Sequence, residues 1–144
     1  MARVAAMIRD DTRHSWIIAL SGCEVTRLEF DWAIGIQLGS GDDRYYLRIE
    51  SPFVLLREGA NESLVVPDIP STVGEVISVL RQQVVQLEVF DDGHLEVQLT
   101  PSRISVPATE DYEPWELTGP NGLRVVSIPG GEIAVWLPTD ETCK

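Results

Sequence analysis

Two segments of the chain repeat one alternating pattern of apolar residues. Residues 25–38 read VTRLEFDWAIGIQL and residues 84–99 read VVQLEVFDDGHLEVQL, and both contain the dipeptides LE and QL. A third alternating run follows each copy, at residues 45–49 and 104–106. A period of two is typical of strands with one buried face, so each copy is predicted to form a three-stranded meander. We interpret the repeat as an internal duplication, with chance similarity between alternating strands as the alternative.

The centre of the first copy is ambiguous when it is taken alone. Apolar residues alternate without a break from Leu28 to Leu38, which favours one long strand. The second copy has Asp92-Gly93 at the matching position, and Asp-Gly between alternating apolar residues indicates a hairpin because both residues accept positive φ. We therefore predict a turn at residues 31–33, with Trp32 near its tip. An uninterrupted strand here would contradict the duplication.

One amphipathic helix is predicted between the two copies, at about residues 72–83. Thr72 and Glu75 have the spacing of a capping box, and Pro70 suits the approach to a helix. Apolar residues recur at helical spacing and are expected to face the core, namely Val73, Val76, Ile77, Leu80 and Val84. Such a helix can cover one open side of a sheet.

The chain closes with a further β unit at residues 113–138. GPNG and PGG within it read as turns, because Pro sets φ at the first corner and Gly accepts positive φ at the second. Their glycines therefore need no ligand to explain them. Trp115 and Trp136 are expected in the core.

Together these patterns predict a mainly β (α+β) fold in a single domain of residues 1–144. The repeat copies, with their flanking residues, span about 16–56 and 84–107. Their antiparallel meanders are expected to form a sandwich or a partly open barrel, with the short helix against one side.

Part of the sequence is similar to a known family. The segments YEPWELTGPNGLRVVSIPGGEIAVW, FDDGHLEVQL and RISVPATEDYE resemble a family of small, mostly actinobacterial proteins known only as a domain of unknown function. The resemblance extends from about Trp16 to Leu137 and is specific chiefly over residues 84–137. DWAIGIQLGSGDDRYYLRIESPF is richer in aromatics than the family pattern, and the middle connection is individual to this chain. The resemblance implies a fold but no activity.

Acidic side chains outnumber basic ones. The chain has 11 Lys and Arg against 23 Asp and Glu, a formal net charge of −12. This charge repels phosphates and anionic membrane surfaces, so neither nucleic acid nor a membrane is an expected partner. Its ordinary explanation is solubility, and its sharper one is a basic protein partner, because complementary charge speeds encounter. No apolar run reaches the length of a membrane span, and Cys23 and Cys143 are not expected to form a disulfide, so a cytoplasmic location is predicted.

No residue is assigned to catalysis, to a cofactor or to a metal. His14 and His94 lack metal-ligand spacing, and a cation site at residues 110–113 would need several converging oxygens. Aromatic and acidic side chains are instead candidates for a partner surface, since Trp and Tyr are enriched at recognition sites. The candidates are Trp32, Tyr45, Tyr46, Tyr112, Glu110, Asp111 and Glu113.

Three functions from different classes stay open. The one we favour is a non-enzymatic interaction module, such as an immunity-like or regulatory acidic partner of a basic protein. The second is a structural homodimer in which exposed strand edges pair. The third is a small-ligand binder or enzyme with a pocket near the tryptophans.

Overall fold

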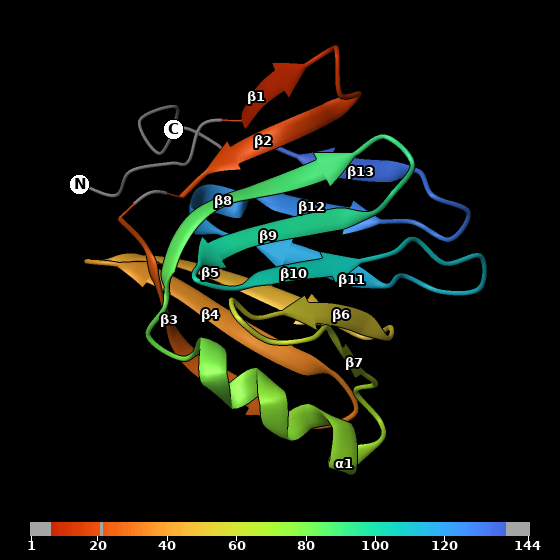
Figure 1. Ribbon diagram of the computed structural model, residues 1–144. Helices are drawn as coiled ribbons and strands as arrows, with labels where there is room; N and C mark the ends of the chain where they lie inside the picture. Colours follow the sequence, from red (N-terminus) through yellow and green to blue (C-terminus); the bar gives the residue numbers. More distant parts are fainter. Residues whose placement is uncertain (1–6, 21, 138–144) are drawn as a thin grey trace.

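The computed structural model describes residues 7–20 and 22–137, which form a mainly β fold (Figure 1). Their strands join in a single antiparallel sheet. The strands are β1 (Met7–Asp10), β2 (Ser15–Ala19), β3 (Glu24–Phe30), β4 (Ile34–Ser40), β5 (Asp43–Ile49), β6 (Phe53–Leu56), β7 (Ser63–Val65), β8 (Gln83–Phe90), β9 (Leu95–Thr100), β10 (Arg103–Val106), β11 (Trp115–Thr118), β12 (Arg124–Ser127) and β13 (Ile133–Trp136).

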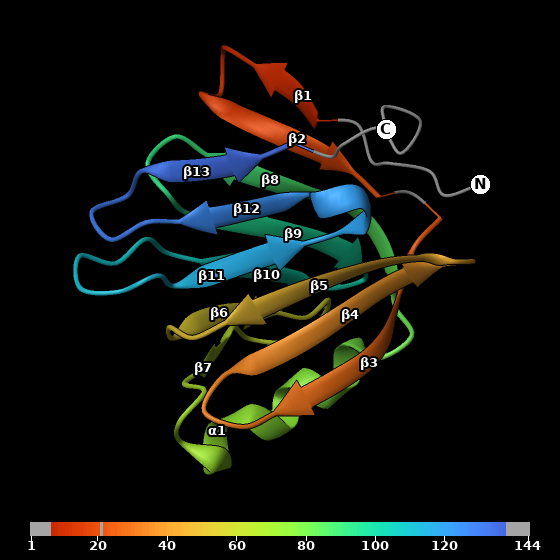
Figure 2. The ribbon, with the colours of Figure 1, turned by 180° about the vertical axis from the view of Figure 1, so that it is seen from behind.

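The sheet bends over on itself, so that two layers face each other (Figures 1 and 2). One layer holds β2, β8, β9, β10, β6 and β7, and the other holds β3, β4, β5, β11, β12 and β13. Buried apolar side chains from both layers form one core. The predicted antiparallel, mainly β architecture is therefore confirmed.

Each of the two similar segments forms a meander. The first is β3–β4–β5 and the second is β8–β9–β10, with every neighbouring pair antiparallel. The first copy is broken at residues 31–33, which form a turn between Phe30 and Ile34. The predicted turn at Trp32 is therefore confirmed, and the single long strand is excluded.

The two meanders also share their irregularities and meet symmetrically. A β-bulge interrupts β3 between Val25 and Arg27, and another interrupts β8 at the matched residues Val84 and Gln86. The amide of Val25 donates to the carbonyl of Gln82 (2.9 Å), and the amide of Val84 donates to the carbonyl of Cys23 (2.9 Å). The two bonds join matched positions of the two segments in opposite directions. This is the arrangement that a local two-fold axis between β3 and β8 would produce.

The correspondence extends beyond the meanders. The order β12-β11-β5-β4-β3-β8-β9-β10-β6-β7 reads the same in reverse when β3–β7 are exchanged with β8–β12. The chain leaves each meander and adds its next strand to the other one, since β6 pairs with β10 and β11 pairs with β5. Pro52-Phe53 and Pro114-Trp115 begin these exchanged strands, and Phe53 and Trp115 are both buried. The strand order thus groups β11 and β12 with the second meander.

The helix differs from its prediction. It consists of α1 (Pro70–Val73) and the 3-10 helix η1 (Gly74–Val79), so it begins and ends earlier than residues 72–83. Thr72 lies inside α1 and does not cap it, because its hydroxyl donates to the carbonyl of Ile69 and accepts from the amide of Val66. The capping-box prediction is therefore wrong. Among the described residues, no helix is long and apolar enough to cross a membrane.

The period of η1 explains which side chains it buries. A 3-10 helix has three residues per turn, and Val76 and Val79 are buried while Val73 packs against the core at the same spacing. Ile77 and Leu80, which an α-helical period would bury, are exposed.

The two tryptophans that are predicted to lie in the core differ in their burial. Trp115 is buried, and its Nε1 donates to the carbonyl of Gly93 (3.0 Å). Trp136 is 51% exposed, because β13 is an edge strand and the indole lies outside the core under the guanidinium of Arg124. The prediction is confirmed for Trp115 and wrong for Trp136.

The PGG turn serves packing. Gly130 has the positive φ of 94° that the predicted turn needs. Gly131 lies against the β8–β9 turn, where an added Cβ on Gly93 would be 2.7 Å from the Cα of Gly131. The glycines therefore let two turns approach each other.

Candidate functional site

Trp32 and an acidic loop lie at the same end of the sheet. Ile34 pairs with Ile49, and Ile49 pairs with Trp115, so the segments next to these residues leave the sheet together. The amide of Glu50 donates to the carbonyl of Pro114 (2.8 Å) and holds two of these segments in contact. We call this region the acidic end, defined by Asp31, Trp32, Glu50, Glu110, Asp111, Tyr112 and Glu113.

Trp32 is the most exposed large apolar side chain in the described part of the chain, at 79%. The turn that carries it is fixed by Asp31, whose carboxylate accepts a hydrogen bond from the amide of Ala33 (2.7 Å). Ala33 is itself buried. A rigid turn that presents an indole to solvent is suited to insertion into a partner's pocket.

The acidic end has more carboxylates than cations. The guanidinium of Arg48 lies 3.6 Å from Asp31 and 3.4 Å from Glu50. Burial lowers the pKa of Arg48, but the charge of Asp31 and the hydrogen bonds of Tyr46 and Glu50 raise it by more, so the net shift is upward. Within residues 7–20 and 22–137, no ion pair is formed by the loop carboxylates of Glu110, Asp111 and Glu113.

The three predicted surface tyrosines lie in different environments. Tyr112 is exposed in the acidic loop. Tyr46 is half-buried on the outer face of β5, where it covers Gly35 and donates a hydrogen bond to Glu29 (2.8 Å). Burial and the Glu29 carboxylate raise its pKa.

Tyr45 is a correction to the predicted surface. It is buried, because its ring packs against Gly119, where an added Cβ would be 2.7 Å from the ring. The alternation of β5 turns Tyr45 and Tyr46 to opposite faces, and only one of those faces is outside.

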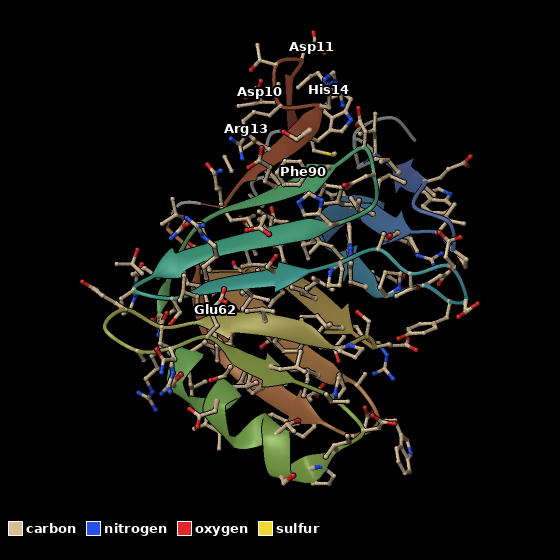
Figure 3. All side chains as sticks on the ribbon, turned by 45° about the vertical axis from the view of Figure 1, so that its right-hand side comes forward. Asp10, Asp11, Arg13, His14, Glu62 and Phe90 are labelled. Atoms are coloured by element: carbon tan, nitrogen blue, oxygen red, sulfur yellow. The ribbon has the colours of Figure 1, made fainter. Side chains whose placement is uncertain are left out.

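A second group of charged residues lies where β2 covers β8. Glu88 is only 5% exposed, and it accepts hydrogen bonds from Arg13 Nε (2.7 Å) and Ser15 Oγ (2.6 Å). Burial raises the pKa of Glu88, but the bonds from Arg13 and Ser15 lower it by more, so the net shift is downward. Figure 3 shows Arg13, His14 and Phe90 gathered at this end of the molecule.

This group borders a polar groove on the outer face of the sheet, with a volume of about 290 Å³. Glu88 pairs with Glu96 across β8 and β9, and Ser105 donates to Glu96. Arg103 donates to the side-chain oxygen of Gln98 (3.1 Å). The groove is lined by Arg13, Ile17, Gln86, Glu88, Glu96, Gln98 and Arg103, without a tryptophan.

This groove has no signal in the sequence. Alternation places Glu88 and Glu96 on an outer face, but it does not show that β2 pairs with β8 and brings Arg13 to Glu88. The polar groups of the groove largely bond one another. A small polar ligand could replace these bonds.

His94 contacts an acidic and an aromatic side chain. His94 Nδ1 lies 2.6 Å from the Asp92 carboxylate, and its ring stacks on Phe90 with centroids 3.9 Å apart. Burial raises the pKa of Asp92, but the hydrogen bonds from His94 lower it by more. No group of three or more His, Cys, Asp or Glu in the described part of the chain could hold a metal ion. Cys23 is buried, and Cys143 lies outside the described residues.

The chain matches the model of a family of unknown function, DUF6188, over residues 16–137. This range agrees with the resemblance seen in the sequence. No curated protein and no solved structure matches the chain.

Proposed function

The chain belongs to the DUF6188 family of unknown function, and we propose that it is a non-enzymatic module that binds a basic protein through the acidic end. The observation that carries this proposal is Trp32, which is 79% exposed on a fixed turn at the same end of the sheet as the acidic loop. An immunity-like inhibitor of a basic toxin or nuclease is one form of such a module. A cytoplasmic location and an actinobacterial range belong to the same proposal.

Two physical terms support binding at this place. A tryptophan side chain buries about 150–250 Å² in an interface, and truncation of such an anchor costs about 2 kcal/mol or more, roughly 30-fold in affinity. The net charge of −12 attracts a basic partner and speeds association at low salt. Trp32 would then supply the lifetime of the complex and the carboxylates its rate of formation.

The test is capture of partners from a lysate of the source organism on three immobilised proteins: the parent, Trp32→Ala and Trp136→Ala. Trp136 is the matched control, because it is also exposed but lies on β13. We expect to capture a basic protein that binds the parent and Trp136→Ala with similar affinity. Its affinity for Trp32→Ala should be lower by about 30-fold. If no captured protein depends on Trp32, or if those that do are acidic, the proposal is wrong.

The polar groove favours a second candidate function, the binding of a small polar ligand. Its volume of about 290 Å³ and its facing carboxylates and guanidinium groups are the reason. Thermal unfolding with a panel of amino acids and polyamines tests it. A ligand of the groove should raise the unfolding temperature of the parent but not of Gln98→Leu.

A further inference from the structure

β3 and β8 occupy equivalent positions in the sheet, but their outer edges differ. β2 pairs with β8 from Ser15 opposite Phe90 to Ala19 opposite Gln86. Residues 27–30 of β3 correspond to this part of β8, and no strand within residues 7–20 and 22–137 pairs with their outer side. The backbone bonds between β3 and residues 81–84 end at Val25.

The matched apolar side chains show what the cover contributes. Leu87 and Val89 of β8 are fully buried where Ile18 and Trp16 of β2 lie opposite them. Their counterparts on β3 are only partly covered. Leu28 is half-buried and Phe30 is 44% exposed.

The matched glutamates differ in the same way. Glu88 is buried under Arg13 and Ser15, which belong to the segment that covers β8. Glu29 has an exposed side chain, with a hydrogen bond from Tyr46 and an ion pair to Arg27 at 3.4 Å. A covering strand with one basic residue would give Glu29 the partner that Arg13 gives Glu88.

We propose that the edge of β3 from Thr26 to Phe30 binds an extended basic segment of the partner protein as an added antiparallel strand. The proposal rests on the proposed function for the basic character of the partner. Strand addition to a free edge is a common mode of peptide recognition, in which the backbone supplies affinity and alternate side chains supply specificity. At β8, Ile18 and Trp16 lie opposite Leu87 and Val89, and Arg13 just before β2 reaches Glu88. By the same pattern, the partner's segment would place apolar residues opposite Leu28 and Phe30 and an Arg or Lys near Glu29.

The position of the edge and the charge of the chain favour another protein over a second copy. Figure 2 shows β3 at the margin of its layer, with the helix behind it. Trp32 lies two residues beyond Phe30, the last residue of β3, so one extended segment can contact the edge and the indole. Two copies of the chain each carry a net charge of −12 and repel each other.

The probe for the test is a peptide of residues 12–19, TRHSWIIA, with acetylated and amidated ends. It is titrated into the isotope-labelled full chain and followed by NMR of the backbone amides. We expect saturable shifts centred on residues 26–30, with the amides of β7 and β13 unchanged. Shifts centred on β8 would mean exchange with β2 and would overturn the proposal.

Backbone methylation shows whether the peptide binds as a strand. One peptide is N-methylated at Trp16 and Ile18 and a second at Ser15 and Ile17. Alternate amides of a strand face opposite sides, so one methylated peptide should lose at least tenfold in affinity while the other binds as the parent does. Equal behaviour of the two would overturn the proposal.

Charge reversal tests whether the Glu29 side chain contributes to binding of the peptide. Glu29→Lys should weaken binding of the peptide at least fivefold, while Glu58→Lys, the same change in the exposed loop before β7, should change it less than twofold. Analytical ultracentrifugation of the full chain shows whether it forms a dimer. A dimer that the peptide dissociates would overturn the proposal in favour of a second copy.

The outcomes separate this inference from the proposed function. If capture of a basic protein depends on Trp32 while the peptide fails to bind β3, the acidic end stands and strand addition fails. If the peptide binds β3 while no partner depends on Trp32, the edge stands and the proposed function fails.

Discussion

The halves β3–β7 and β8–β12 have the same strand order but different surroundings. β8 is covered by the β1–β2 hairpin, which Arg9 also ties to the β8–β9 turn through two hydrogen bonds to Asp91 (2.7 Å each). β3 has no such cover among the described residues. Similar strands therefore have different degrees of burial, which are decided by segments outside the two meanders.

This difference can be tested by substitutions at matched positions. Stability is measured in each case as the free energy of unfolding from urea denaturation. The pairs below run from the largest expected effect to the smallest.

The largest effect is expected at the start of the exchanged strands. Trp115→Ala should cost about 4 kcal/mol, and Phe53→Ala about 3 kcal/mol, because both rings are buried and only the indole also loses a hydrogen bond, to Gly93. Trp136→Ala, at an exposed indole, should cost less than about 1 kcal/mol. A small loss at either buried ring would contradict the equivalence of the two strands.

The covered and open edges should respond differently to the same change. Leu87→Ala should cost about 3 kcal/mol, since its side chain is fully buried where β2 pairs with β8. Leu28→Ala should cost about 1 kcal/mol, since its side chain is half-buried. Equal losses would show that β3 is covered in solution.

Two glycines with similar φ sharpen the account of the turns. Gly93→Ala should cost about 2 kcal/mol, because φ is 96° and the new Cβ would be 2.7 Å from Gly131. Gly130→Ala has a φ of 94° but meets open space, so it should cost about 1 kcal/mol. The difference between them measures the contact between the two turns.

The smallest effect is expected in the pH dependence of the free energy of unfolding. The pKa of Glu88 is lowered in the folded state, so its contribution to stability is present above the unfolded pKa of about 4.3 and is lost as pH falls through the folded value. Glu88→Gln should therefore flatten the fall of unfolding free energy between about pH 5 and pH 3. Glu29→Gln is the matched control at an exposed carboxylate, and an equal flattening there would contradict the role of the Arg13 cover.

The sequence was sufficient for much of this fold. Alternation and the Asp92-Gly93 signal predicted both meanders, the turn at Trp32 and its exposure, because these features depend on local periodicity and turn chemistry. The helix was misplaced because three- and four-residue periods coincide at Val73 and Val76 and differ only beyond them.

The rest depends on contacts between distant segments. Nothing local shows that β2 pairs with β8, and so the burial of Glu88 and the polar groove were not predicted. Tyr45 and Trp136 were placed wrongly for the same reason, since their burial depends on which strands lie over them.

The exchange of β6 and β11 between the meanders has a consequence for how the molecule is assembled. Each half completes the sheet of the other, so neither half has a closed hydrogen-bonding pattern by itself. Unfolding of one half removes strands from the other, which predicts a single cooperative transition. In topological terms the two halves are arranged like the subunits of a strand-swapped dimer whose subunits are joined by the middle connection.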